Sequence, residues 1–320
     1  MRFPRTFFVA WLSCALLAVS ATIATAQETR IALVIGNSDY IHLPRLRNPE
    51  GDAETLSIAL SNLGFTVYLA NNLNHAELLR ALAIYASKSK DADVSLIYYA
   101  GHSAALAQQN LIFPVDFDPK NQQQRDALVK LNDITTLMQS GASTNIILFD
   151  ACQEAISFQT ASGEIPLRSL SPSAPPVGTL ISYASSAGFA AHDGLGHHSL
   201  FTGALLDNMA QPDIDIEQTL RRVRRDVIRN SQGTQVPQTS SSLVTDFYFY
   251  PTQPTKIGKS LQSALLHSGF GEKPILNNIA SGVPAPVSAS LPSKPDTERA
   301  ILRDVLCSNL APPRPSICKK

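Results

Sequence analysis

The sequence predicts an α/β fold in which a mostly parallel sheet carries helices on both faces. Short apolar runs rich in Val, Ile, Leu and Tyr alternate with longer segments in which apolar residues recur every three or four positions. The short runs are typical of buried parallel strands, and the longer segments are typical of amphipathic helices. Because strand and helix alternate from Arg30 onward, one domain with a parallel sheet is expected over 27–250.

The first half of this domain contains two expected strands and two expected helices. An apolar strand at 31–35 precedes a helix at 50–63, whose inward face consists of Ala53, Leu56, Leu60 and Leu63. A second strand is expected at 65–69. A second helix is expected at 74–88, because Asn74 is a favourable N-cap and the apolar residues that follow it share one face.

The second half of the domain is less regular. Strands are expected at 94–100, 145–149 and 177–184, and helices at 132–139, 200–209 and 215–229. The last helix has an apolar inner stripe, so its arginine cluster is expected to be a solvated outer face. Residues 154–176 are rich in Ser and Pro without periodicity, which indicates a long loop. The adjacent histidines His197 and His198 are expected in a solvated loop as well.

The first 26 residues are typical of a secretory signal peptide. Arg2 and Arg5 precede an apolar run, and Ala24-Thr25-Ala26 forms a cleavage site before Gln27. The expected location is therefore periplasmic or secreted, with no stable membrane insertion after cleavage. An uncleaved N-terminal anchor is the alternative, because residues 7–26 contain no charge and nearly reach the length that spans a bilayer.

Residues 251–320 differ in composition from the rest of the chain. They hold 10 of the 21 prolines, which indicates a linker with a short helix near 296–306 rather than a packed core. Cys307 and Cys318 lie close together in this tail and are the natural disulfide pair in an oxidising compartment. That pairing leaves Cys152 as a free thiol.

Two of the expected strands end in reactive side chains. Gly101-His102 follows the strand at 94–100, and Asp150-Ala151-Cys152 follows the strand at 145–149. The carboxyl ends of parallel strands meet at one edge of a sheet, so an imidazole is expected to face a thiol there. In this arrangement Cys152 is the nucleophile and His102 is the general acid and base. The backbone N–H groups of Ser103 and Cys152 are the candidate oxyanion donors.

Two other interpretations use the same residues. One is a core histidine and an inert buried thiol, since free Cys is among the most buried residue types. The other is the nucleophile elbow of an α/β-hydrolase, in which Ser103 is the nucleophile and Asp150 and His192 complete a triad. An elbow requires a substantial helix after the serine, whereas the apolar run 111–114 follows within eight residues.

Charge and motifs exclude several other classes of protein. The formal net charge is zero, so no nucleic-acid partner is indicated. Gly36-Asn37 is not followed by the residues of a phosphate-binding loop, and Gly194 and Gly196 do not form a dinucleotide fingerprint. No organic cofactor and no metal-ligand spacing is indicated. The expected partners are protein or peptide substrates.

A series of motifs runs through the domain in a fixed order. They are Ala32-Leu33-Val34-Ile35-Gly36-Asn37 with Tyr40, Leu46-Arg47-Asn48-Pro49 with Asp52-Ala53, Tyr98-Tyr99-Ala100-Gly101-His102, Phe113-Pro114-Val115-Asp116, Leu148-Phe149-Asp150-Ala151-Cys152, Ala191-His192-Asp193-Gly194 with Ser199-Leu200-Phe201-Thr202, Val223-Arg224-Arg225-Asp226-Val227, and Gln235-Val236-Pro237 with Ser241-Ser242-Leu243. On these motifs the block 30–249 resembles the caspase-like peptidase domain of bacteria, which is related to metacaspases and caspases. The 50-residue interval from His102 to Cys152 is also similar to the interval in caspases.

The resemblance implies a caspase-like three-layer sandwich that acts as a cysteine endopeptidase. It implies that His102 and Cys152 are the catalytic dyad and that Asp52 and Asp150 line the primary specificity pocket. Carboxylates there suit an Arg or Lys side chain at the cleavage position, because a guanidinium pairs with carboxylates in fork geometry. Without the resemblance, Asp52 reads as a surface residue of a first helical turn and Asp150 as a turn residue at a strand end.

Two positions depart from the family pattern. Ser103 stands where the family usually has a second glycine, and Gln153 stands where it usually has Arg. A β-carbon at position 103 restricts the backbone conformations that aim an N–H at an oxyanion. The main alternative is therefore a weakly active or inactive homologue that serves as a binding or scaffold module.

Two further expectations concern regulation. Some metacaspases respond to calcium, and Asp116 and Asp118 are the candidate ligands for calcium activation. No calcium-loop pattern is present, so no metal site is predicted. Arg168 is the only basic residue in the long loop, so an enzyme specific for basic residues is expected to cleave itself there.

Overall fold

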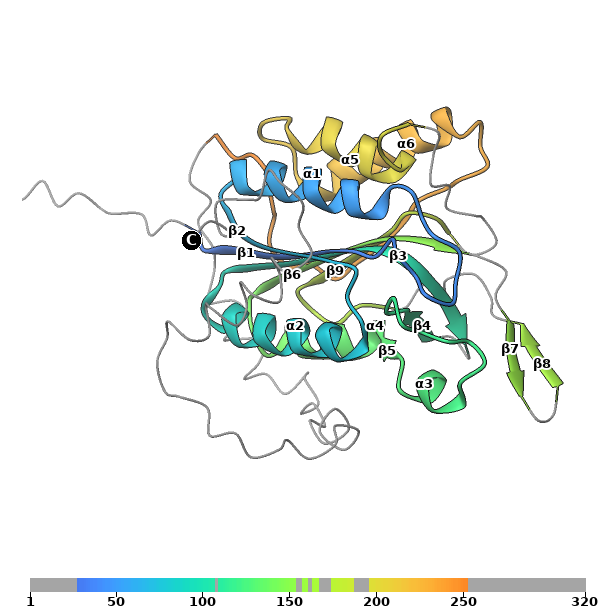
Figure 1. Cartoon of the computed structure of the whole chain (residues 1–320). Coiled ribbons are helices and arrows are strands. Elements are labelled where there is room, and N and C mark those ends of the chain that lie inside the picture. The colour runs from blue at the N-terminus through green and yellow to red at the C-terminus, as the bar shows by residue number, and fades with distance from the viewer. Residues whose placement is uncertain are drawn as a thin grey trace, which may run out of the picture.

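A mostly parallel sheet forms the centre of the molecule (Figure 1). The computed structural model describes residues 28–106, 109–153, 157–160, 163–166, 174–186 and 196–252. The strands lie in the spatial order β10 (Gln238–Ser241), β9 (Thr179–Tyr183), β6 (Thr144–Gln153), β3 (Val94–Leu106), β1 (Arg30–Gly36) and β2 (Phe65–Asn71). Neighbours in this order are parallel, except that β10 runs antiparallel to β9.

Some of the predicted features lie outside these ranges. They are the signal peptide at 1–26, His192, the cleavage site at Arg168, the Cys307–Cys318 pair and the tail beyond 252. Within the described ranges, no helix combines the length and the apolar character needed to cross a lipid bilayer.

Helices cover both faces of the sheet (Figure 1). The helices α1 (Pro49–Asn62), α5 (Leu200–Met209) and α6 (Ile216–Asn230) pack on one face, and α2 (His75–Lys88) and α4 (Leu131–Gln139) pack on the other. Two short segments, η1 (Ser89–Asp91) and α3 (Gln122–Asp126), connect the longer elements. The predicted three-layer fold class is confirmed, and each of the five expected helices is present within one residue or so of its predicted bounds.

Alternating side chains along the strands supply two cores. In β1, the residues Ile31, Leu33 and Ile35 pack toward α2 and α4, whereas Ala32 and Val34 pack toward α1. Successive side chains of a strand point to opposite faces of a sheet. A continuous apolar run is therefore what a sheet covered on both faces requires, and all seven residues of β1 are buried.

The two strands expected to carry the chemistry are longer than predicted. β3 continues past Ala100 to Leu106, and β6 continues past Phe149 to Gln153. The extension of β3 arises because β4 (Gln109–Ile112) folds back antiparallel on the end of β3 and pairs in turn with β5 (Val129–Lys130). Partners on both sides hold the end of β3 in an extended conformation, a constraint that the local sequence does not reveal.

The segment between β6 and β9 also differs from the prediction. Within the expected loop at 154–176, β7 (Ser157–Thr160) and β8 (Gly163–Pro166) form an antiparallel hairpin with paired residues from Ser157↔Pro166 to Thr160↔Gly163. A hairpin of this kind is held by backbone pairing, so it needs no amphipathic period in the sequence. The interpretation of this whole segment as an irregular loop was therefore wrong.

Candidate active site

His102 is fully buried near the end of β3, and its ring is held in place from two sides. Its Nε2 atom lies 2.8 Å from the carbonyl oxygen of Pro44. Its ring packs against the ring of Tyr40 with centroids 4.4 Å apart and an interplanar angle of 54°. A carbonyl oxygen only accepts hydrogen bonds, so Nε2 carries a proton and Nδ1 is the basic nitrogen of the neutral ring.

Two tyrosines hold the backbone of the same residue. The backbone N–H of His102 donates to the Tyr40 hydroxyl over 2.8 Å, and the His102 carbonyl accepts from the Tyr99 hydroxyl over 2.8 Å. The two phenol oxygens are 3.3 Å apart. Burial raises the pKa of Tyr99 well above its ordinary value, so its hydroxyl stays protonated and remains a donor.

Gly101 makes room for these two hydroxyls. A Cβ atom at this position would lie 2.6 Å from the Tyr40 hydroxyl oxygen and 2.7 Å from that of Tyr99. Real Cβ atoms essentially never approach other atoms so closely. Glycine is therefore required before the histidine because the Tyr40 and Tyr99 hydroxyls pack closely against its Cα atom, in addition to any conformational reason.

The loop between β1 and α1 carries Tyr40 and Pro44 to the histidine. Its start is held by Asn72, which follows β2 and adopts a left-handed backbone conformation with φ 54°. The Asn72 side-chain oxygen accepts from the backbone N–H groups of Ser38 (2.8 Å) and Asp39 (3.0 Å). Asn tolerates this conformation better than most residues. Tyr40 belongs to a motif quoted above, but no role was predicted for it, and neither Pro44 nor Asn72 was recognised from the sequence.

Cys152 is paired with His102 by the register of the sheet. β3 and β6 are parallel and in register from Val94↔Thr144 to Ser103↔Gln153, and this ladder includes His102↔Cys152. The two strand ends are thus brought together as predicted. The position of the Cys152 side chain is outside the described atoms.

Ser103 is buried between two strands. It pairs with Gln153 of β6 on one side and with Ile112 of β4 on the other, and it is 0% exposed. Within the described structure its hydroxyl makes no hydrogen bond. The α/β-hydrolase interpretation of Ser103 was wrong, because β3 continues through this residue and pairs with another strand where an elbow requires a turn and a helix.

Asp52 and Asp150 come from different elements and meet at one serine. Asp52 lies in the first turn of α1, and Asp150 lies in β6. The backbone N–H of Ser199 donates to Asp52 Oδ2 over 3.1 Å, and the Ser199 hydroxyl donates to Asp150 Oδ2 over 2.5 Å. Asp52 is 1% exposed and Asp150 is 5% exposed. The interpretation of Asp52 as a surface residue was therefore wrong.

Asp150 is surrounded by hydroxyl donors at the start of α5. Its Oδ2 atom accepts from Thr202 Oγ1 over 2.7 Å, and Tyr98 Oη lies 3.4 Å away. Ser199 is the N-cap of α5, so the carboxylate also faces the positive end of a helix dipole. Ser199 and Thr202 belong to a motif quoted above, yet their role depends on a tertiary contact that no local signal predicts.

The two carboxylates give this region a negative potential in a poorly solvated setting. Burial raises the pKa of Asp52, and hydrogen bonds from Ser199 and His198 oppose that shift. The pKa of Tyr98 is raised well above its ordinary value, first by burial and then by the negative charges of Asp150 and Asp52. A cationic group that entered here would be stabilised by both carboxylates.

His198 does not lie free in a solvated loop as expected. Its Nδ1 atom is 2.7 Å from Asp52 Oδ1, and its side chain is 31% exposed. The residue immediately precedes Ser199, the N-cap of α5, which explains how the chain brings it onto the carboxylate. The neighbouring His197 is exposed, as predicted for both histidines.

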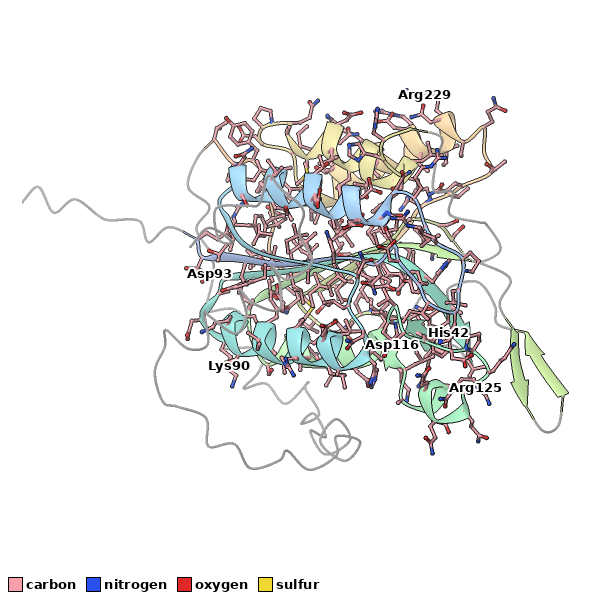
Figure 2. All side chains as sticks on the ribbon, in the orientation of Figure 1. His42, Lys90, Asp93, Asp116, Arg125 and Arg229 are labelled. Atoms are coloured by element: carbon pink, nitrogen blue, oxygen red, sulfur yellow. The ribbon has the colours of Figure 1, made fainter. Side chains whose placement is uncertain are left out.

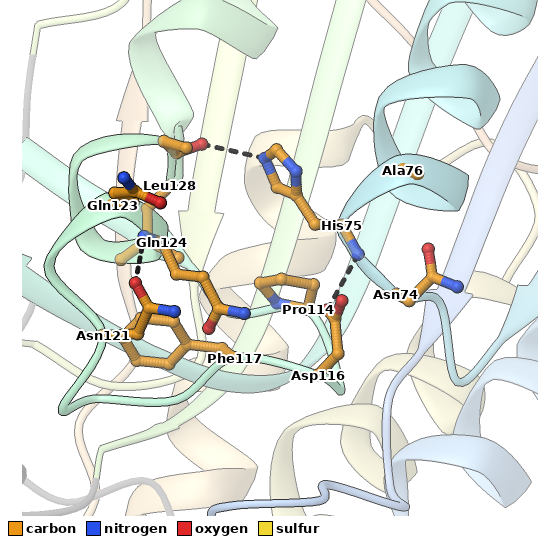
Figure 3. A pocket seen from close by; sticks show the side chains of 11 residues that line it. Asn74, His75, Ala76, Pro114, Asp116, Phe117, Asn121, Gln123, Gln124 and Leu128 are labelled. Carbon is orange, nitrogen blue, oxygen red and sulfur yellow. Dashed lines mark hydrogen bonds between the residues drawn. The ribbon is translucent and has the colours of Figure 1, made fainter.

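A separate pocket of about 590 Å³ lies beside the N-terminus of α2 (Figure 3). Its polar lining includes His75 and Asp116, and Asp116 Oδ1 accepts from the His75 backbone N–H over 2.9 Å. Figure 2 shows Asp116 and Arg125 near β4 and α3, away from Arg229 on α6. Since His102, Ser103, Asp52 and Asp150 do not line this pocket, it is distinct from the region described above.

Backbone N–H groups donate to both candidate calcium ligands, Asp116 and Asp118. Asp116 accepts from the His75 N–H, and Asp118 Oδ1 accepts from the Lys120 N–H over 2.9 Å. In the described part of the chain, no group of three or more His, Cys, Asp or Glu side chains is arranged to hold a metal ion. Calcium usually takes six to eight oxygen ligands, more than Asp116 and Asp118 supply by themselves.

Comparison with known proteins identifies the family. The model of the caspase domain family matches residues 29–248, which is most of the chain. The chain therefore belongs to the caspase domain family, and the resemblance seen in the sequence is confirmed. Its domain is that of a cysteine-type peptidase family.

Individual relatives are similar over shorter segments. Mucosa-associated lymphoid tissue lymphoma translocation protein 1 from Homo sapiens is 27% identical over 127 residues, which is 40% of this chain and 15% of the human protein. Caspase-1 from Rattus norvegicus is 31% identical over 80 residues, which is 24% of this chain and 20% of that protein. The chain thus matches a fifth or less of the length of these curated relatives.

Proposed function

We propose that this chain is a cysteine-type endopeptidase that cleaves peptide bonds after Arg or Lys. The observation that carries the proposal is the parallel register that pairs His102 with Cys152 in a chain of the caspase domain family. Residues in register on neighbouring strands lie on the same face of a sheet. An imidazole and a thiol at such positions suit nucleophilic catalysis.

In the proposed reaction His102 moves the protons. Its Nε2–H donates to the Pro44 carbonyl, so Nδ1 is the atom that accepts the proton of the Cys152 thiol. The thiolate attacks the scissile carbonyl, and the same Nδ1 then protonates the leaving amine. Water hydrolyses the thioester that remains. The backbone N–H groups of Ser103 and Cys152 are the proposed donors to the tetrahedral oxyanion.

The proposed preference for a basic residue rests on the acidic pair. Asp52 and Asp150 are both buried and are joined through Ser199. A buried carboxylate is costly unless a cation or several donors compensate it. The cationic end of an Arg or Lys side chain is therefore the substrate group that this pair suits best, whereas an acidic side chain is repelled.

The thiol and imidazole supply the nucleophile and the proton transfers, so the reaction as proposed uses no cofactor. Residues 1–26 are proposed to direct the protein to a periplasmic or secreted location and to be removed. N-terminal sequencing of the protein recovered from that location tests this, since an N-terminus at Met1 would contradict cleavage.

The central experiment is hydrolysis of matched fluorogenic peptides that differ only in the last residue before the reporter: Arg, Lys, citrulline or Asp. The wild type is expected to prefer Arg over its neutral isostere citrulline by about 100-fold. Both Cys152→Ala and His102→Ala should abolish turnover. A wild type without Cys152-dependent turnover of any peptide contradicts the proposal and favours the binding or scaffold module.

Self-processing provides an independent test on a protein substrate. Arg168 is the proposed cleavage site, and intact-mass measurement of the purified full chain shows whether the bond after it is cut. Cleavage is expected in the wild type and absent from both Cys152→Ala and Arg168→Ala. Equal cleavage in the wild type and in Cys152→Ala would mean that another protease is responsible.

A further inference from the structure

His198 covers the carboxylate that is proposed to receive the substrate's cationic side chain. Its Nδ1 atom lies 2.7 Å from Asp52 Oδ1, and the side chain of Asp52 is 1% exposed while that of His198 is 31% exposed. The imidazole is thus partly in contact with solvent and the carboxylate beneath it is not.

The two oxygens of Asp52 have different partners. Oδ2 accepts from the backbone N–H of Ser199, which is fixed at the start of α5. Oδ1 accepts from the imidazole of His198, which is attached by rotatable side-chain bonds. A ligand can therefore take the place of the second partner without disturbing the first.

The position of His198 in the chain makes this exchange possible. It precedes the N-cap Ser199, so its backbone makes no hydrogen bond within α5. The ring can rotate off Asp52 while the helix, the Ser199 bridge and Asp150 stay in place. The groups that face this region are Asp52 from α1, Asp150 from β6 and Tyr98 from β3, with His197 next in the chain.

We propose that His198 is a displaceable cap on the primary specificity pocket, which competes with the substrate's Arg or Lys side chain for Asp52 Oδ1. The proposal deepens the proposed function, because it assumes that Asp52 receives the substrate's cationic group. A guanidinium or ammonium that enters the pocket takes over the hydrogen bond that the imidazole made. Binding of substrate therefore includes the free-energy cost of breaking the His198–Asp52 contact.

Direct binding of benzamidine, a small cationic mimic of an arginine side chain, tests this proposal without requiring catalysis. The full chain carrying Cys152→Ala is titrated by calorimetry at pH 7.5, alone and combined with His198→Ala. The His198→Ala protein is expected to bind benzamidine roughly threefold to tenfold more tightly, the size of one typical net hydrogen bond that no longer competes. The matched control is His197→Ala, which removes an exposed histidine one residue away and should leave the affinity unchanged.

Each result supports or overturns the proposal. Tighter binding only in His198→Ala supports the cap, and His198→Gln, which restores a neutral donor, should lie between that variant and the wild type. Equal or weaker binding in His198→Ala overturns it, as does the absence of benzamidine binding in every variant. Peptide hydrolysis is measured separately: turnover with an unchanged benzamidine affinity leaves the proposed function standing without the cap. Tighter binding without turnover leaves the cap standing without the peptidase.

Discussion

The hydroxyl of Tyr40 lies 2.8 Å from the backbone nitrogen of His102, and the two rings pack with their centroids 4.4 Å apart. One side chain thus fixes both the backbone and the ring of the histidine. Tyr40 comes from the loop after β1, so the position of His102 depends on a segment about 60 residues earlier in the chain. Catalysis by proton transfer is sensitive to small displacements of the base, so this contact should influence rate more than substrate binding.

Tyr40→Phe is expected to lower kcat by about tenfold while leaving KM nearly unchanged, because His102 loses one of its anchors but Asp52 and Asp150 keep their contacts. The variant also leaves a buried N–H without its acceptor, which should cost about 1–3 kcal/mol of unfolding free energy. Tyr85→Phe is the matched control, since the Tyr85 hydroxyl is buried and bonded to Ser95 and Leu96. The control should lose stability but not kcat. Equal loss of kcat in both variants would show that Tyr40 acts only through stability.

Gly101→Ala should disrupt the contacts of Tyr40 and Tyr99 with the backbone of His102. The new Cβ atom would lie 2.6 Å from the Tyr40 oxygen and 2.7 Å from the Tyr99 oxygen, so one phenol or the β3 backbone must move. Overpacking of this kind typically costs about 1–3 kcal/mol, and we expect turnover to fall by at least about tenfold as His102 shifts. Gly51→Ala is the control, because a Cβ there has no atom within 4 Å. Denaturant unfolding and peptide hydrolysis of both variants check the prediction, which fails if Gly101→Ala retains full activity.

Local signals in the sequence account for much of the fold. Asn74 was predicted to cap a helix, and in the structure it forms a capping box with Glu77 at the start of α2. The apolar runs of β1 and β6 were likewise visible, because strands buried on both faces need apolar residues at every position. The extension of β3 beyond Ala100 was not predictable in this way, since it depends on pairing with β4.

The sequence pointed to the main residues of the candidate site but not to the tertiary contacts that join them. The strand ends predicted that His102 and Cys152 would face each other, and the structure places the two residues in register. The family resemblance pointed to Asp52 and Asp150. Ser199 was recognised only as part of a motif before a helix, whereas its bridge between the two carboxylates is a contact between distant segments. His198 was assigned to solvent for the same reason: nothing near it in the sequence shows that it meets Asp52.

Asp52→Asn should make the protein more stable at neutral pH while abolishing the preference for Arg over citrulline. Burial raises the pKa of Asp52 in the folded state. Its contribution to stability is therefore fully present below the ordinary pKa of an aspartate and is lost as the pH rises through the raised value. The ionised carboxylate is the form that burial disfavours, so we expect Asn, which cannot ionise, to raise the free energy of unfolding at pH 7.5. Urea unfolding at pH 7.5 and at pH 4 measures the difference, which should shrink at the lower pH.

Asp226 is the matched control for this pH dependence, because its pKa is shifted in the opposite direction from that of Asp52. The pKa of Asp226 is lowered, first by the hydrogen bond from Asn208. Its contribution is present above the ordinary pKa and is lost as the pH falls through the lowered value. Asp226→Asn should therefore reduce stability at pH 7.5, with a smaller effect at acid pH. If Asp52→Asn lowers stability at pH 7.5, as Asp226→Asn is expected to do, burial does not destabilise the Asp52 carboxylate.

Ser103→Gly is expected to raise kcat by about tenfold, because a missing or misdirected oxyanion donor costs two to three orders of magnitude and glycine restores only the backbone freedom. Ser103→Ala is the sharpest comparison. Both substitutions remove a buried hydroxyl that makes no hydrogen bond in the described structure, but only glycine removes the β-carbon. Peptide hydrolysis of the two variants separates backbone freedom from the hydroxyl. Equal rates for Ser103→Gly and Ser103→Ala would show that the β-carbon at position 103 does not limit catalysis.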